Sequence, residues 1–196
     1  MAKSSEISVS RRIYHWINFI SIIALSISGW YIHSPFMTAT FSMGFMRLTH
    51  FIFMWIFTTN FMLRVYWAFF GKGGDWRKYI AQRWFNGKVL KATGRHYLMY
   101  DHWPEGMQDR ILQNTTYLFL AVLYIVQILT GLALFYNASG SIAFVGNILG
   151  GLQAVRQLHL FLMWFFIMFT VIHFYMGASE EWDKIKLMFF GVADER

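Results

Sequence analysis

The sequence contains no cysteine among its 196 residues. This absence excludes an iron–sulfur cluster held by the chain itself, a zinc site built on thiolates, and covalently attached c-type haem. A redox centre in this protein would therefore have to be held by histidine or methionine, or be bound without a covalent link.

Charged residues are also scarce. They make up 14% of the chain, against 57% hydrophobic and 20% aromatic residues. This composition is too apolar for an ordinary soluble domain, and the length fits a single domain over residues 1–196. We predict an all-α integral membrane four-helix bundle in the lipid bilayer. Its expected spans are residues 13–33, 44–70, 115–136 and 156–177.

Basic residues predict the orientation of these spans. Three lie in the amino-terminal segment, eight between residues 71 and 112, and none between 137 and 153. Because basic residues accumulate on the cytoplasmic side, we expect both termini and the loop 71–112 to be cytoplasmic. The same bias explains the net charge of +7, so nucleic acid is not an expected partner. The expected location is the bacterial cytoplasmic (inner) membrane, with several passes.

The fourth span contains two histidines, His159 and His173, fourteen residues apart. At 1.5 Å per residue they are about 21 Å apart along the helix axis, and both rings leave the same face. Polar side chains inside a membrane span are costly and usually functional. Two of them on one stripe indicate ligands for two stacked centres.

The orientation gives each intramembrane histidine a depth. His50 and His159 fall near the outer side, whereas His15 and His173 fall near the cytoplasmic side. Neutral imidazole is a standard ligand of haem iron, whereas structural zinc needs four ligands at one point. We therefore predict two non-covalent haems b, with iron bound by His50 and His159 in the outer haem and by His15 and His173 in the inner haem. With both axial positions filled, such centres would transfer electrons.

Other polar residues are weaker candidates. On helix geometry alone His33 competes with His50, although its place beside Ser34 and Pro35 favours an interfacial residue. His96 and His102 lie in the basic loop and are expected to be solvated or to line a nearby site. Three arginines are candidate contacts of haem propionates, with snorkelling towards lipid head groups as the alternative: Arg47, Arg64 and Arg156.

Several motifs together resemble a known family. They are R-I-Y-H-W at 12–16, G-W-Y-I at 29–32, M-R-L-T-H-F at 46–51, L-R-V-Y-W-A-F-F-G at 63–71 and H-F-Y-M at 173–176. With the spacing of His159 and His173, they resemble the b-type cytochrome subunit of membrane-bound nickel–iron uptake hydrogenases. The H-W-P at 102–104 departs from the H-N-P common in that family. The family's haem ligands fall on His15, His50, His159 and His173.

The resemblance implies a division of labour between subunits. The chain would anchor a periplasmic hydrogenase, made of a nickel–iron large subunit and an iron–sulfur small subunit, and pass its electrons across the membrane to quinone. It would have no hydrogen-activating site and no catalytic residue of its own. Candidate residues for the quinone site are Tyr14, Arg64, Tyr175 and His102. Two alternatives remain: a cytochrome b subunit of a membrane formate dehydrogenase, and a haem-free membrane anchor.

Overall fold

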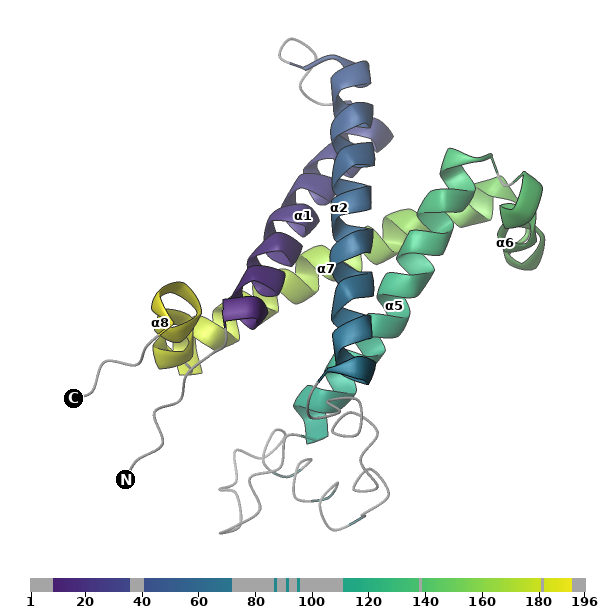
Figure 1. Cartoon of the computed structure of the whole chain (residues 1–196). Coiled ribbons are helices and arrows are strands. Elements are labelled where there is room, and N and C mark those ends of the chain that lie inside the picture. Colours follow the sequence, from purple (N-terminus) through teal and green to yellow (C-terminus); the bar gives the residue numbers. More distant parts are fainter. Residues whose placement is uncertain are drawn as a thin grey trace, which may run out of the picture. The chain divides into compact units, whose positions relative to one another are not determined.

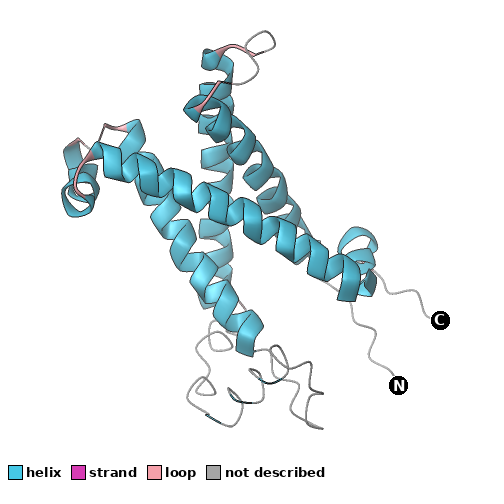
Figure 2. Cartoon of the chain, turned by 180° about the vertical axis from the view of Figure 1, so that it is seen from behind, coloured by secondary structure: helices cyan, strands magenta, loops and turns pink. Residues whose placement is uncertain are grey.

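The computed structural model describes residues 9–35, 41–71, 87, 91, 95, 111–137, 139–180 and 182–191. In this part of the chain every regular element is a helix and there is no strand (Figure 2). A helix satisfies its backbone hydrogen bonds internally, which a segment surrounded by lipid requires. The predicted all-α fold is confirmed.

Four of the helices are long: α1 (Val9–His33), α2 (Met43–Phe70), α5 (Ile111–Phe135) and α7 (Leu152–Glu180) (Figure 1). Each exceeds the roughly 20 residues that cross a bilayer. Each also contains an apolar window with a mean hydropathy between 1.2 and 2.4. The chain is therefore a multi-pass membrane protein with four candidate spans, as the sequence predicts. Which side of the membrane holds the termini stays a prediction.

The chain forms two compact units, whose boundaries fall within α2 and α5. One unit contains residues 65–126; there the rings of Tyr66 and Phe70, at the end of α2, lie 5.0 Å apart. The other contains residues 1–64 and 127–196, and holds all four histidines predicted as ligands. The expectation of a single domain stays a prediction.

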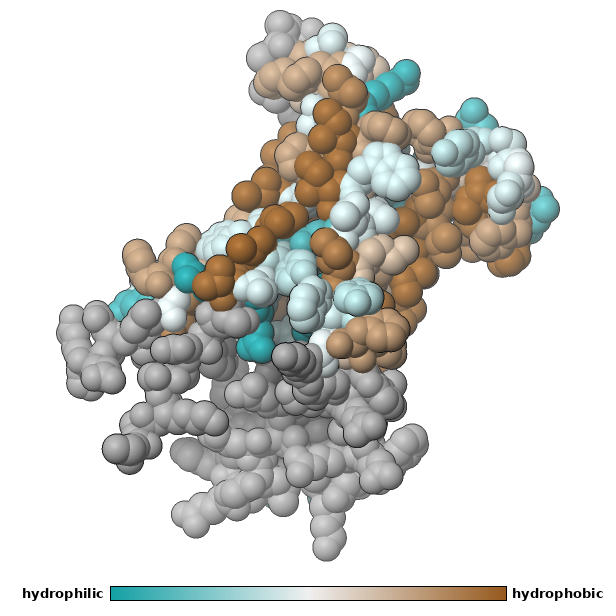
Figure 3. Space-filling view, viewed as in Figure 1, coloured by the Kyte–Doolittle hydropathy of each residue, from teal (hydrophilic) through white to brown (hydrophobic). Residues whose placement is uncertain are grey.

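The long helices present mostly apolar side chains outward (Figure 3). Only 11% to 17% of the residues in each apolar window are buried inside the protein. Large side chains such as Ile20, Phe161 and Phe174 are more than half exposed. Apolar surface on this scale would be unfavourable in water and is typical of contact with lipid.

Polar contacts hold α1 against α2. Asn60 on α2 is 5% exposed, and its amide nitrogen donates to the side-chain oxygen of Asn18 at 2.7 Å and to the carbonyl of Tyr14 at 3.1 Å. In an apolar environment an unpaired amide is costly, so this contact favours one register between the two helices. Asn18 and Tyr14 flank His15, which places the contact next to a predicted ligand.

A short helix, α6 (Ala143–Leu149), follows the 3-10 turn η2 (Gly140–Ile142) in the connection before α7. Gly150 and Gly151 end it with φ angles of 87° and 104°, which side chains with a Cβ rarely adopt. The amide of Gly151 donates to the carbonyl of Gly146 at 2.7 Å and closes the turn. This helix lies between the third and fourth predicted spans, where the sequence analysis predicted none.

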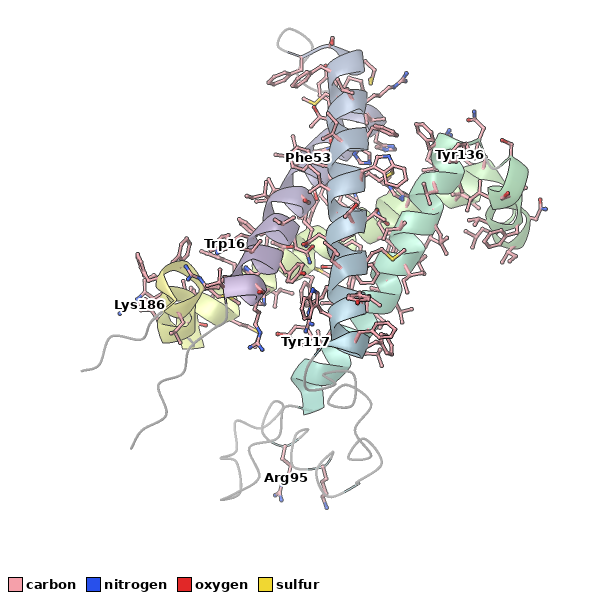
Figure 4. The ribbon with its side chains drawn as sticks, viewed as in Figure 1. Trp16, Phe53, Arg95, Tyr117, Tyr136 and Lys186 are labelled. Carbon is pink, nitrogen blue, oxygen red and sulfur yellow. The ribbon has the colours of Figure 1, made fainter. Side chains whose placement is uncertain are left out.

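A second short helix, α8 (Trp182–Phe190), follows α7, beyond the last of the four predicted spans. Arg12 on α1 donates to the carbonyls of Met188 and Phe189 at the end of α8. The indole of Trp16 donates to the carbonyl of Met188 at 3.2 Å. Figure 4 shows Trp16 on the part of α1 that lies next to α8. The start of α1 and the end of α7 are therefore on the same side of this unit.

Candidate functional site

The four intramembrane histidines form two pairs, and α7 contributes one member to each. His15 of α1 lies beside His173, with ring centroids 6.2 Å apart. His50 of α2 lies beside His159, with ring centroids 6.4 Å apart. These are the two pairs that the depth argument predicts.

The spacing within each pair fits two ligands of one metal ion. A metal–imidazole bond is about 2.0 Å and the ring nitrogen lies about 1.1 Å from the ring centre, so imidazoles on opposite sides of one ion have centroids about 6 Å apart. Among the described residues there is no group of three or more His, Cys, Asp or Glu that could hold a metal. Each pair could therefore supply two nitrogen ligands to a metal ion whose other ligands come from a bound group.

His50 has a hydrogen-bond partner on the neighbouring helix. Its Nδ1 lies 2.9 Å from the hydroxyl oxygen of Ser28, which donates its own hydrogen to the carbonyl of Ala24 at 2.6 Å. Because that hydrogen is already used, the hydroxyl oxygen is the acceptor of a hydrogen bond from Nδ1–H. The tautomer this favours leaves the Nε2 lone pair available to a metal.

His159 has the same kind of partner on α5. Its Nδ1 lies 2.9 Å from the hydroxyl oxygen of Thr130, which donates to the carbonyl of Gln127 at 3.0 Å. In addition, the amide nitrogen of Gln127 lies 3.3 Å from both Nε2 and the carbonyl oxygen of His159. At 3.3 Å the hydrogen bond from the Gln127 amide to Nε2 of His159 is long. An iron ion bound to Nε2 would replace this amide at the nitrogen lone pair.

The pair of His15 and His173 has a different environment. Nδ1 of His15 is buried and has no hydrogen-bond partner within the described part of the chain. The ring of Trp16 meets the His15 ring edge-on at 5.4 Å, and Phe169 stacks on His173 at 6.0 Å with 12° between the planes. In the described part of the chain this pair is thus contacted by aromatic rings, and His173 itself is exposed.

Comparison with known proteins supports a cytochrome. The family model described as "Prokaryotic cytochrome b561" matches residues 7–191. The chain belongs to the prokaryotic cytochrome b561 family.

Curated relatives in this family carry hydrogenase names. The chain is 26% identical to a probable Ni/Fe-hydrogenase B-type cytochrome subunit of Azotobacter chroococcum, over 87% of this chain and 78% of that protein. It is 27% identical to a subunit of the same name in Cupriavidus necator, over 87% and 77%. It is 26% identical to the probable Ni/Fe-hydrogenase 1 B-type cytochrome subunit of Escherichia coli, over 87% and 80%. The resemblance seen in the sequence motifs is thus confirmed.

Membership of the b561 family implies haem b, and the residues present fit that group. Each histidine pair offers two nitrogen ligands at a suitable spacing, and in one pair the buried Nδ1 of His15 has no hydrogen-bond partner among the described residues. Beside the other pair, a Cβ added at Gly29 or Gly131 would lie 3.1 Å or 3.2 Å from Cε1 of His50 or His159. These glycines leave room for the two rings. Ligation by the four histidines and the number of haems stay predictions.

The remaining candidate residues are scattered. His33 and Arg47 are exposed, and Arg156 is exposed and donates to the side chain of Gln153 at 3.0 Å. Arg64 is half-buried and lies about two turns before the end of α2 at Phe70. The roles of the three arginines as propionate contacts stay predictions.

Of the quinone-site candidates, Tyr14, Arg64 and Tyr175 lie within the described residues and His102 does not. Tyr175 is 70% exposed on α7, two residues after His173, and Tyr14 precedes His15 on α1. His96 and His102 lie outside the described residues, as does most of the basic loop, in which Gly87, Lys91 and Arg95 are helical.

The sequence analysis missed Ser28 and Thr130. Each is 1% exposed and each is followed directly by a glycine. A hydroxyl residue before glycine, within an apolar span at the level of a predicted ligand, is the signal that would have identified them.

Proposed function

We propose that the chain is the di-haem cytochrome b subunit of a membrane-bound nickel–iron hydrogenase. It would anchor the periplasmic large and small subunits and carry electrons from the iron–sulfur small subunit to a quinone. Two haems b would supply the one-electron chemistry. The observation that carries this proposal is the pair of histidine contacts, with ring centroids 6.2 Å and 6.4 Å apart, at two levels of one helix.

The chain's own contribution is to place these ligands. On α7 the fourteen residues between His159 and His173 separate the two levels by about 21 Å. His50 on α2 pairs with His159, and His15 on α1 pairs with His173. If the basic loop is cytoplasmic, His50 and His159 face the small subunit, and His15 and His173 face the quinone. Tyr14 and Tyr175, next to the second pair, then become the residues to examine for quinone contact.

The comparisons favour hydrogenase over the alternatives. The relatives described above are named as hydrogenase cytochrome subunits, which supports this partner over a formate dehydrogenase. The histidine pairs and the family both argue against a haem-free anchor.

Haem stoichiometry and spectra test the proposal. We expect two haems per chain, extractable with acidified solvent because no cysteine tethers them, and a low-spin six-coordinate spectrum in both redox states. One haem per chain, or a high-spin spectrum, would show that the ligand pairing is wrong. Identification of the subunits that co-purify distinguishes hydrogenase from formate dehydrogenase.

A further inference from the structure

The same two-residue arrangement occurs twice around one histidine pair. On α1, Ser28 contacts Nδ1 of His50 and Gly29 faces Cε1 of the same ring. On α5, Thr130 contacts Nδ1 of His159, and Gly131 faces Cε1 of that ring. The other pair differs: Nδ1 of His15 has no hydrogen-bond partner among the described residues, and the ring of His173 stacks on Phe169.

The hydroxyl groups act on the ligand nitrogen through the ring. Both hydroxyl hydrogens are directed to helix carbonyls, so both oxygens accept from Nδ1 at the same distance of 2.9 Å. A hydrogen bond from Nδ1–H increases the electron density at Nε2 and makes the imidazole a stronger ligand. Chained hydrogen bonds polarise one another, so the carbonyl behind each hydroxyl strengthens the effect.

The glycines fix where each ring lies. Cε1 is the ring atom between Nδ1 and Nε2, and the nearest position of a Cβ would be 3.1 Å from it at Gly29 and 3.2 Å at Gly131. A methyl group at this distance would displace the ring by a few tenths of an ångström. Such a displacement would move the ligand nitrogen and the hydrogen bond to the hydroxyl together.

We propose that Ser28–Gly29 and Thr130–Gly131 are two matching cradles that orient His50 and His159 and lower the midpoint potential of the haem they bind. This inference rests on the proposed function, in that the two histidines are iron ligands. A stronger ligand stabilises ferric iron more than ferrous iron, which lowers the potential. Ser28 and Thr130 are positioning residues, because they act through the histidines.

The test uses the complex as purified, with Ser28→Ala and Thr130→Val singly and combined. Haem content is measured chemically, and the two potentials by an optical redox titration; electron paramagnetic resonance records the ferric low-spin signals. We expect one potential to rise in each single variant and to rise further in the double variant, with one of the two ferric signals altered. The other haem should keep its potential and its signal. Selective loss of one haem in these variants would also support the cradle.

Three control variants isolate the hydroxyl effect. Ser21→Ala removes another serine hydroxyl from α1 that is equally buried, at 1% exposed, and whose oxygen has no hydrogen-bond partner among the described residues. It should leave both potentials unchanged. Ser28→Thr and Thr130→Ser keep a hydroxyl group and should retain the parental potentials and signals.

Two kinds of failure can be separated. If His50→Ala retains both haems, ligation by this pair is wrong and the proposed function fails with it. If His50→Ala loses one haem, while Ser28→Ala and Thr130→Val shift neither potential, only the cradle proposal is overturned. Equal shifts of both haems, or an equal shift in Ser21→Ala, would overturn it too.

Discussion

The two histidine pairs differ more in their surroundings than in their own geometry. Their ring centroids are 6.2 Å and 6.4 Å apart, so either pair could hold the same group. His50 and His159 each face a hydroxyl group and a glycine, whereas His15 meets the ring of Trp16 and the exposed His173 stacks on Phe169. Both pairs thus use histidine as the ligand, but the groups next to each histidine can set its strength as a ligand separately. Two haems on one electron path need different environments if their potentials are to differ.

Removing one ligand from either pair should have the largest effect. His173→Ala should remove the haem held with His15, and His159→Ala the haem held with His50. In both variants we expect hydrogen oxidation with a soluble dye to persist, because the dye can take electrons from the partner subunit, and hydrogen-to-quinone activity to fall to background. Haem content and the two activities are measured together.

His33→Ala is the control for these variants, because His33 is exposed at the end of α1. It should retain two haems and both activities. If His173→Ala assembled and still reduced quinone at the parental rate, the path through both pairs would be wrong.

Adding a methyl group at a cradle should affect one pair only. Gly29→Ala or Gly131→Ala would place a Cβ about 3 Å from a ligand ring. Disturbed support around a metal ligand typically costs 10–100-fold in affinity, and we expect a loss of that order for the haem of His50 and His159. Haem retention during dilution in detergent measures it.

Gly44→Ala is the matched change, because the nearest atom to its added Cβ is 3.9 Å away, in Ser42. It should retain both haems. Equal loss from both histidine pairs in Gly29→Ala would show that the methyl group disturbs the whole bundle rather than one ring.

Breaking the contact between α1 and α2 should weaken haem binding by His15 and His173. Asn60→Leu removes the hydrogen bonds to Asn18 and to the carbonyl of Tyr14, on either side of His15. Polar contacts between membrane helices contribute on the order of 1 kcal/mol, so we expect a modest loss of stability. On heating, the haem of His15 and His173 should be released at a lower temperature, as followed by its optical band. Asn60→Asp is not a substitute, because it buries a charge.

Changing Gln127 should have the smallest effect. Its amide lies 3.3 Å from Nε2 of His159, next to the lone pair that would bind iron, and its Oε1 is buried without a partner in the described residues. Gln127→Leu removes a weak competitor of the metal, so we expect haem content equal to or slightly above the parental value. A selective loss of one haem would show that the amide supports the ligand instead.

Much of this organisation was predictable from the sequence. Hydrophobic runs set the four spans, because a bilayer of fixed thickness requires a minimum apolar length. The helical repeat placed His159 and His173 on one face, and depth alone paired them with His50 and His15. The short helices α6 and α8 were not predicted, because segments of seven and nine residues carry little periodicity and depend on their neighbours.

The sequence by itself predicted the depth of each histidine and determined which face of its own helix each residue occupies. It excluded thiolate chemistry and supplied four imidazoles at two levels. Only the tertiary structure decided which helix faces which, and so which small polar groups meet a ligand. Ser28 and Ser21 are both serines of α1 with the same exposure, yet Ser28 forms a hydrogen bond with His50, and the hydroxyl of Ser21 has no hydrogen-bond partner in the described residues. The difference arises because helix packing sets rotation and register through contacts between segments far apart in the chain, which periodicity along one segment does not encode.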